Sequence, residues 1–127
     1  MGVVSKKVSE GKLLTIGQAR DVVAKAMPEE DFRDRKVLLI VPDGTRTAPV
    51  GTMFKAIHDQ IGGTAAALDV MIALGTHQAM SEEAIEQRLE IAHDERTGLD
   101  ASVQLFNHGW DDPGALRDIG TLSTEEI

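Results

Sequence analysis

The 127-residue sequence contains no cysteine, which excludes disulfide bonds, thiolate metal sites and thiol catalysis. Basic residues are also in short supply, with 13 Lys and Arg against 21 Asp and Glu. The resulting formal charge of −8 disfavours non-specific binding to nucleic acid or to an anionic membrane. Any anionic ligand must therefore be held by a local site.

Long apolar runs are missing as well. No stretch of roughly 7–15 apolar residues follows Lys6 and Lys7, and no run of about 18 apolar residues occurs anywhere. We therefore expect neither a signal peptide nor a membrane span, and we expect the chain to lie in the cytoplasm. The length and the 42% hydrophobic content suit one globular domain.

The apolar residues alternate between helical and strand-like patterns. Helical spacing predicts helices at 16–26, 50–61 and 81–92, and apolar runs predict strands at 37–41, 68–74 and 101–106. The run at 37–41 is continuously apolar, which is typical of a strand that is covered on both faces. This order predicts an α/β fold, Rossmann-like, with a mainly parallel sheet and helices on both faces.

The predicted organisation has three parts. Residues 1–12 form a loose lead-in, and residues 13–122 form an N-terminal α/β domain. Residues 123–127 resemble the first turn of a helix with no helix after it, so we interpret them as the truncated start of a next element. We expect the domain to be incomplete at this end.

Polar side chains follow the first predicted strand directly: Asp43, Thr45, Arg46 and Thr47. Open α/β sheets bind small ligands at such strand-to-helix turns, and the free backbone N–H groups of the helix attract anions. Arg46 can hold a carboxylate through two parallel hydrogen bonds, and Asp43 can accept from a substrate hydroxyl or orient Arg46. The two threonines can cap the helix or contact ligand oxygens. Each residue also has an ordinary structural use, so a purely structural turn stays open.

A second polar turn follows the next strand, where Gly75 and Thr76 precede His77. His77 is the best candidate for a general base, because an imidazole exchanges protons near neutral pH. A lone loop histidine is more often structural, and that reading also stays open. If the two strands are neighbours in a parallel sheet, Asp43, Arg46 and His77 share one edge, and the group then favours an active site.

His108 follows the third predicted strand and is a possible further member of the site. The sequence has no metal-binding spacing of the His-Glu-x-x-His type and no glycine pattern of a phosphate loop. We therefore expect no metal site in this segment.

These residues stand in blocks that resemble the N-terminal part of the lactate racemase family, the nickel-pincer-nucleotide-dependent racemases and epimerases of 2-hydroxy acids. The blocks are VPDGTRTAP at 41–49, ALGTH at 73–77, MSEEAI at 80–85, NHGW at 107–110 and DIGT at 118–121. Their order and spacing together are far more specific than any single block.

The resemblance implies roles for the site residues. Arg46 and Asp43 would hold a small 2-hydroxy acid or support the catalytic groups, and His77 would be one of two histidines that handle the substrate hydroxyl proton. The carbon-bound hydrogen is too weakly acidic for a side-chain base, so a cofactor carries that step as a hydride transfer.

The resemblance also implies what this segment lacks. The cofactor would be the nickel-pincer nucleotide, but the tethering lysine, the nickel-ligating histidine and the second catalytic histidine of the family lie beyond residue 127. We therefore expect this segment to be inactive alone and to act with the remaining C-terminal part of a parent protein. The alternative is a non-enzymatic α/β module that binds a small carboxylate or phosphate through Arg46 and the helix ends.

Overall fold

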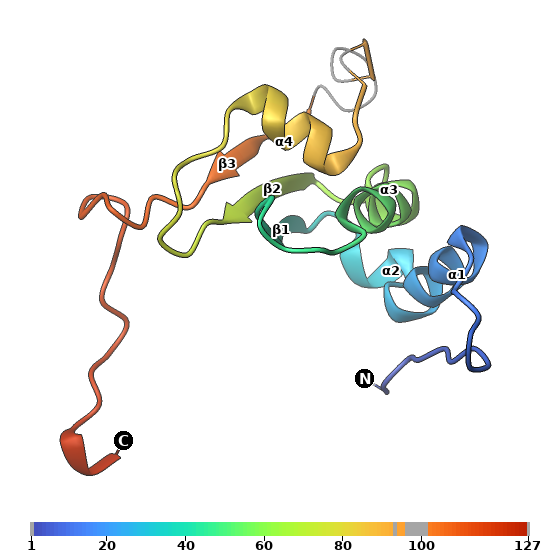
Figure 1. Ribbon diagram of the computed structural model, residues 1–127, viewed down its shortest axis with the longest axis horizontal. Coiled ribbons are helices and arrows are strands. Elements are labelled where there is room, and N and C mark those ends of the chain that lie inside the picture. The colour runs from blue at the N-terminus through green and yellow to red at the C-terminus, as the bar shows by residue number, and fades with distance from the viewer. Residues whose placement is uncertain (1, 93, 96–101, 127) are drawn as a thin grey trace.

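The computed structural model describes residues 2–92, 94–95 and 102–126 (Figure 1). The elements follow the order α1 (Ile16–Ala26), α2 (Glu29–Phe32), β1 (Lys36–Pro42), α3 (Val50–Ile61), β2 (Ala67–Ala73), α4 (Glu82–Leu89), β3 (Leu105–Asn107) and the 3-10 helix η1 (Thr124–Glu126). None of the helices in the described residues combines the length and the apolar character needed to cross a membrane.

The three strands form one parallel sheet in the order β1-β2-β3. Pro42 pairs with Ala73 at the ends of β1 and β2, and Ile72 pairs with Asn107 of β3. The carboxyl ends of all three strands therefore meet at one edge of the sheet (Figure 1). The predicted α/β fold with a parallel sheet is confirmed.

Helices α3 and α4 pack on one face of the sheet and enclose the main core. This core is formed by the buried residues Val50, Phe54, Val70, Ile72, Leu74, Ile85, Leu89, Ile91 and Val103. The helix starts follow ordinary capping chemistry: the Ser81 hydroxyl accepts a hydrogen bond from the Ala84 amide, and Thr15 forms a capping box with Gln18. Helix α1 lies against the outside of α3, where Arg20 pairs with Asp59.

The other face of the sheet is open in the described part of the chain. Leu38 is 49% exposed, Ile40 63% and Phe106 43%. The structure thus differs from the expected cover of both faces. Helices α3 and α4 pack on one face, and α1 packs on α3. A continuous apolar run shows that both faces of a strand are apolar, but it does not supply the layer that would cover the second face.

Other differences concern element ends. Helix α4 ends at Leu89, three residues before the expected end, because Glu90 adopts the left-handed conformation with φ of 57°. Strand β3 begins only at Leu105, and residue 101 of the expected strand lies outside the described residues. The short helix α2 lies between the expected helix at 16–26 and the expected strand at 37–41, with three acidic residues in its first turn.

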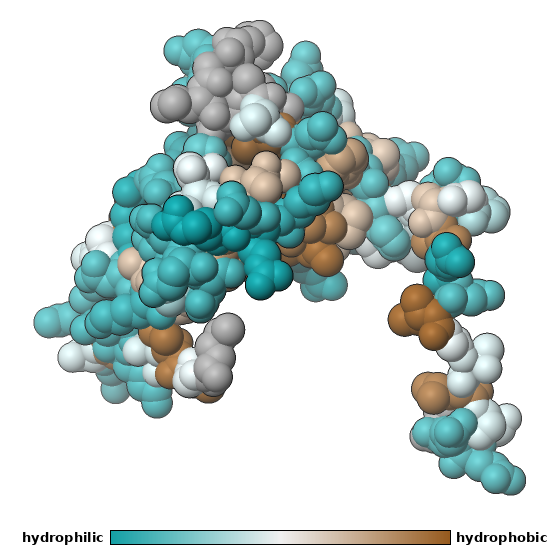
Figure 2. All heavy atoms as spheres, turned by 180° about the vertical axis from the view of Figure 1, so that it is seen from behind, coloured by the Kyte–Doolittle hydropathy of each residue, from teal (hydrophilic) through white to brown (hydrophobic). Residues whose placement is uncertain are grey.

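The C-terminal segment extends away from the sheet (Figures 1 and 2). Its apolar side chains are exposed: Leu116 by 49%, Leu122 by 71% and Ile119 fully. In Figure 2, this segment extends at the right and carries brown, apolar patches. In the described structure these residues therefore add nothing to the core.

Helices α3 and α4 come into close contact at Gly51. A Cβ atom at Gly51 would lie 2.5 Å from Cγ and 2.8 Å from Cβ of Glu90. Glu90 has little freedom to move, because its backbone N–H bonds to the carbonyls of Glu86 and Gln87 while it ends the helix in the left-handed conformation. Only glycine allows this approach.

We expect Gly51→Ala to lower the free energy of unfolding by about 1–3 kcal/mol, because the added methyl group must displace Glu90 or separate the helices. Gly63→Ala is the matched control, since a Cβ there meets no atom within 4 Å; it should change the free energy by about 0.5 kcal/mol or less. Urea unfolding followed by circular dichroism measures both variants. Equal, small effects would contradict the close contact.

Candidate active site

A cavity of about 400 Å³ opens at the carboxyl ends of β1 and β2. Its lining comes from the strand ends and from the turns that follow them: Ile40, Val41, Pro42, Asp43, Thr45, Arg46, Ala73, Leu74, Gly75 and His77. The parallel pairing of the two strands places these two turns side by side. This is the edge of an open α/β sheet at which ligands bind.

Asp43 is the buried anchor of the site, with only 4% of its surface exposed. Its Oδ1 accepts hydrogen bonds from the Thr45 hydroxyl at 2.5 Å and from the Thr45 backbone amide at 3.1 Å. Its Oδ2 lies 2.6 Å from Nδ1 of His77. The Thr45 hydroxyl first, and then His77, lower the pKa of Asp43 from 3.8 to about 2. Asp43 is therefore a carboxylate at neutral pH.

The carboxylate of Asp43 determines which nitrogen of His77 is available to a ligand. Because an ionised carboxylate can only accept, Nδ1 of His77 carries the proton and donates a hydrogen bond to Oδ2 of Asp43. When the imidazole is neutral, Nε2 then holds the free lone pair. The His77 side chain is 54% exposed and lines the cavity, so Nε2 is accessible to a bound molecule.

The turn that carries His77 has a defined local cause. Gly75 adopts a φ of +62°, which favours glycine, and the backbone amide of His77 closes the turn by donating to the Leu74 carbonyl at 3.0 Å. The sequence pattern of glycine before Thr76 and His77 thus sets the turn that brings the imidazole over the strand end.

Arg46 provides the positive charge of the cavity. Its backbone amide donates to the Asp43 carbonyl at 3.3 Å, so the same turn positions both residues. The Arg46 guanidinium makes no hydrogen bond or ion pair with any of the described residues. It is therefore available to an anion.

Arg88 is a residue of the site region that the sequence patterns did not reveal. It lies in the last turn of α4, where a cation also suits the helix dipole. Its Nη2 donates to the Arg46 carbonyl at 2.7 Å, and its Nε donates to the Pro42 carbonyl at 3.3 Å. Arg88 thereby ties α4 to the turn that holds Asp43 and Arg46. Only the folded chain brings residues so distant in the sequence together.

The structure does not bring every predicted residue into the cavity. Thr47 is exposed and does not line it. His108 is also absent from the lining; its backbone amide donates to the Ile72 carbonyl at 3.0 Å and so extends the pairing of β2 with β3. The residues that gather around the cavity are Asp43, Thr45, Arg46 and His77.

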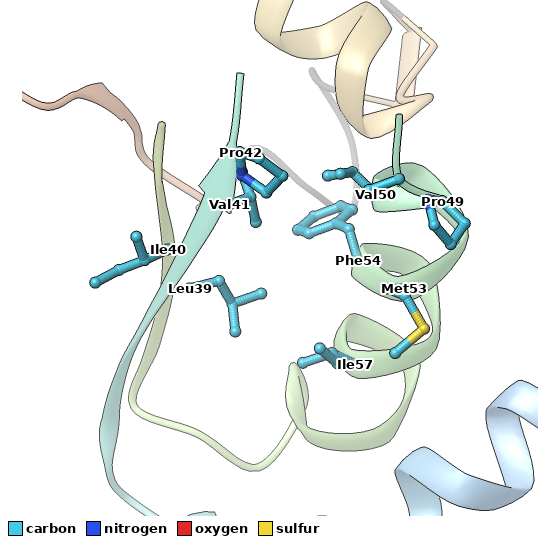
Figure 3. A pocket seen from close by; sticks show the side chains of 10 residues that line it. Leu39, Ile40, Val41, Pro42, Pro49, Val50, Met53, Phe54 and Ile57 are labelled. Carbon is cyan, nitrogen blue, oxygen red and sulfur yellow. The ribbon is translucent and has the colours of Figure 1, made fainter. Parts of the chain in front are cut away.

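A second, apolar groove of about 270 Å³ lies between β1 and α3. Figure 3 shows Leu39 and Val41 of β1 facing Phe54 of α3 across it, with Met53 and Ile57 on the same helix. No charged side chain lines this groove. It therefore offers nothing to bind a carboxylate, and the polar cavity remains the candidate active site.

The described residues do not form a metal site. Among them, no three His, Asp or Glu side chains lie together in a way that could hold a metal ion. The lining of the polar cavity also contains no lysine. What the cavity offers is a cation, a buried carboxylate and an imidazole with an accessible nitrogen, which suits an anionic ligand that must lose or gain a proton.

Comparisons with known proteins concern the family and the fold of the chain. A family model described as the lactate racemase N-terminal domain matches residues 10–126. A crystal structure of a protein from Thermotoga maritima is similar at 28% sequence identity, with a TM-score of 0.76. The similarity covers 93% of this chain but only 27% of that one. No curated protein matches the chain.

We expect the Asp43 carboxyl to titrate near pH 2 in the folded protein. Because this pKa lies below the ordinary value of 3.8, the ionised carboxylate stabilises the fold above about pH 4, and the contribution is lost as the pH falls towards 2. A ¹³C NMR titration of the side-chain carboxyl measures the pKa directly. A midpoint at or above 3.8 would contradict the hydrogen bonds described here.

Thr45→Val tests the main cause of this low pKa. It should raise the pKa of Asp43, because it removes the hydroxyl that donates to Oδ1. Thr47→Val is the matched control, since the Thr47 hydroxyl makes no hydrogen bond to Asp43 within the described structure. The two variants should therefore differ in the same NMR titration.

Proposed function

The chain belongs to the lactate racemase family through its N-terminal domain, and on this premise we propose that it provides the substrate-binding and proton-handling part of a racemase or epimerase of small 2-hydroxy acids. The observation that carries the proposal is the Asp43–His77 pair, which faces a cavity with an unengaged guanidinium. A 2-hydroxy acid offers the two groups that such a cavity would hold, a carboxylate and a hydroxyl.

Arg46 would bind the substrate carboxylate. A guanidinium presents two parallel N–H groups that match the two carboxylate oxygens, and it stays charged at every physiological pH. The net charge of −8 makes such a local cation necessary, because the protein as a whole repels anions. This contact would also orient the rest of the substrate towards His77.

His77 would exchange the proton of the substrate hydroxyl at Nε2. Asp43 would hold the ring in the required tautomer through Nδ1 and would stabilise the imidazolium that forms when the proton is taken. Thr45 would act through Asp43, since its hydroxyl and amide fix the orientation of the carboxylate. The proton would move between the hydroxyl oxygen and Nε2 of His77.

The cofactor proposed for the whole protein is the nickel-pincer nucleotide, which would accept the carbon-bound hydrogen of the substrate. The described residues of this chain do not fit the roles of nickel ligand or cofactor tether, because they form no metal cluster and the cavity lacks a lysine. We propose that those roles belong to a further, C-terminal part of the protein. The similar Thermotoga maritima chain is correspondingly longer, since the match covers 27% of it.

In the cofactor-loaded full-length protein, we expect Arg46→Lys to lower kcat/KM by more than about tenfold, because lysine cannot form the two parallel hydrogen bonds. Arg20→Lys is the matched control, since Arg20 lies on α1 and pairs with Asp59 at 2.8 Å; its activity should match the wild type. Chiral chromatography of a panel of 2-hydroxy acids measures the interconversion of stereoisomers.

The same panel separates the enzymatic proposal from the alternative of an anion-binding module. An unchanged kcat/KM in Arg46→Lys would remove Arg46 from the substrate site. Binding of small carboxylates or phosphate, with no interconversion of any hydroxy acid by the wild-type protein, would contradict the enzymatic proposal and favour the module.

We expect His77→Gln to lower kcat by about 10²–10⁴-fold, because glutamine cannot exchange a proton with the substrate hydroxyl. His108→Gln should change kcat by less than about threefold, since His108 does not line the cavity. Single-turnover kinetics with the loaded protein compares the two variants. If both variants lost the same kcat, the residues that line the cavity would not be the only ones that take part in the reaction.

A further inference from the structure

The segment that carries His77 has no regular structure of its own. Residues 74–81 connect β2 to α4 without a helix or a strand, and His77 lies in the middle of them. Within this connection, the bond from the His77 amide to the Leu74 carbonyl is the backbone hydrogen bond that holds the turn. An imidazole that must stay 2.6 Å from Asp43 needs more support than this.

Trp110 provides one such support. Its indole Nε1 donates a hydrogen bond to the backbone carbonyl of His77 at 3.0 Å. The Trp110 ring is partly buried against the hydrophobic core, so the donor is held in place by packing. An indole N–H can only donate, and its acceptor here is the backbone carbonyl of His77, the residue that carries the imidazole.

Asn107 provides a second support by binding Met80, which lies three residues after His77 in the same connection. Its Nδ2 donates to the Met80 carbonyl at 2.8 Å, and its Oδ1 accepts from the Met80 amide at 2.9 Å. One side-chain amide thus satisfies both backbone groups of Met80, as a neighbouring strand would. The connection is fixed where it turns into α4.

Both supports stand on the same rigid base. Asn107 is the last residue of β3 and pairs with Ile72 of β2. The His108 amide then donates to the Ile72 carbonyl, and the Trp110 amide donates to the His108 carbonyl at 2.9 Å. The turn from 107 to 110 is therefore anchored to the strand from which the His77 connection starts. In Figure 1, this turn and the connection lie together beyond the ends of β2 and β3.

We propose that Asn107 and Trp110 are positioning residues that hold the His77 connection on the end of β3 and thereby keep the imidazole against Asp43. They act through the backbone of residues 77 and 80 and do not line the cavity. The catalytic consequence rests on the function proposed above, whereas the placement of His77 does not.

The first test is the pKa of Asp43 in this chain without substrate. Trp110→Phe keeps the ring but removes the N–H donor, and Asn107→Ala removes both bonds to Met80. In each variant the pKa of Asp43 should rise from about 2 towards 3.8, because His77 withdraws while the bonds from Thr45 remain. Gln104→Ala is the matched control, since the exposed Gln104 side chain makes no hydrogen bond with the described residues. This substitution should leave the pKa of Asp43 unchanged.

The second test is kinetic and uses the loaded full-length protein. Trp110→Phe should lower kcat by roughly tenfold or more and change KM by less than about threefold, because Arg46 belongs to the other turn. A general loss of folding would instead reduce the amount of active protein and leave the pKa of Asp43 in the folded fraction unchanged.

The outcomes separate this inference from the proposed function. If the pKa of Asp43 stays at its wild-type value in Trp110→Phe and in Asn107→Ala, the positioning role is wrong whatever the activity. If the pKa of Asp43 rises but the wild-type protein converts no hydroxy acid, the positioning role stands and the proposed function falls. Should Asn107→Ala fail to fold, Trp110→Phe alone decides, since it keeps the packed ring.

Discussion

The hydrogen bond between the buried carboxylate of Asp43 and the imidazole of His77 joins the ends of two neighbouring strands, and the geometry of the cavity depends on it. A carboxylate with so little exposure needs hydrogen-bond partners to stay ionised. Thr45 and His77 supply them, and the same bonds leave the outer nitrogen of the ring free. The bonds from Thr45 and His77 together keep Asp43 ionised, and the bond with His77 also orients the imidazole.

The elements around Asp43 and His77 have two roles. Some form the hydrophobic core, and others position the two turns. The core between the sheet and the helices α3 and α4 holds the strands in parallel register, which brings the two turns together. Side chains from other elements then fix the turns. Arg88 of α4 binds the carbonyls of the first turn, and the segment 107–110 binds the backbone of the second. Neither turn is held by its own residues alone.

The covered and the open face of the sheet meet at the cavity. Val41 and Leu74 come from the covered side, whereas Ile40 and Ala73 come from the side that the described helices leave exposed. The cavity is therefore bounded by apolar strand ends below and by polar turns above. Asp43 is buried there, whereas the side chains of Arg46 and His77 stay exposed and can be reached by a ligand.

The sequence by itself determined the local features: helices at 16–26 and 50–61, the first two strands, the helix cap at Ser81 and the polar residues that end each strand. These follow from apolar spacing, capping chemistry and turn residues, which act over a few positions. Only the tertiary structure decided that Asp43 binds His77, that Arg88 and Trp110 hold the turns, that His108 stays outside the cavity, and that one sheet face is open. Those contacts join residues more than thirty positions apart or depend on which layers cover the sheet, and no local pattern encodes either.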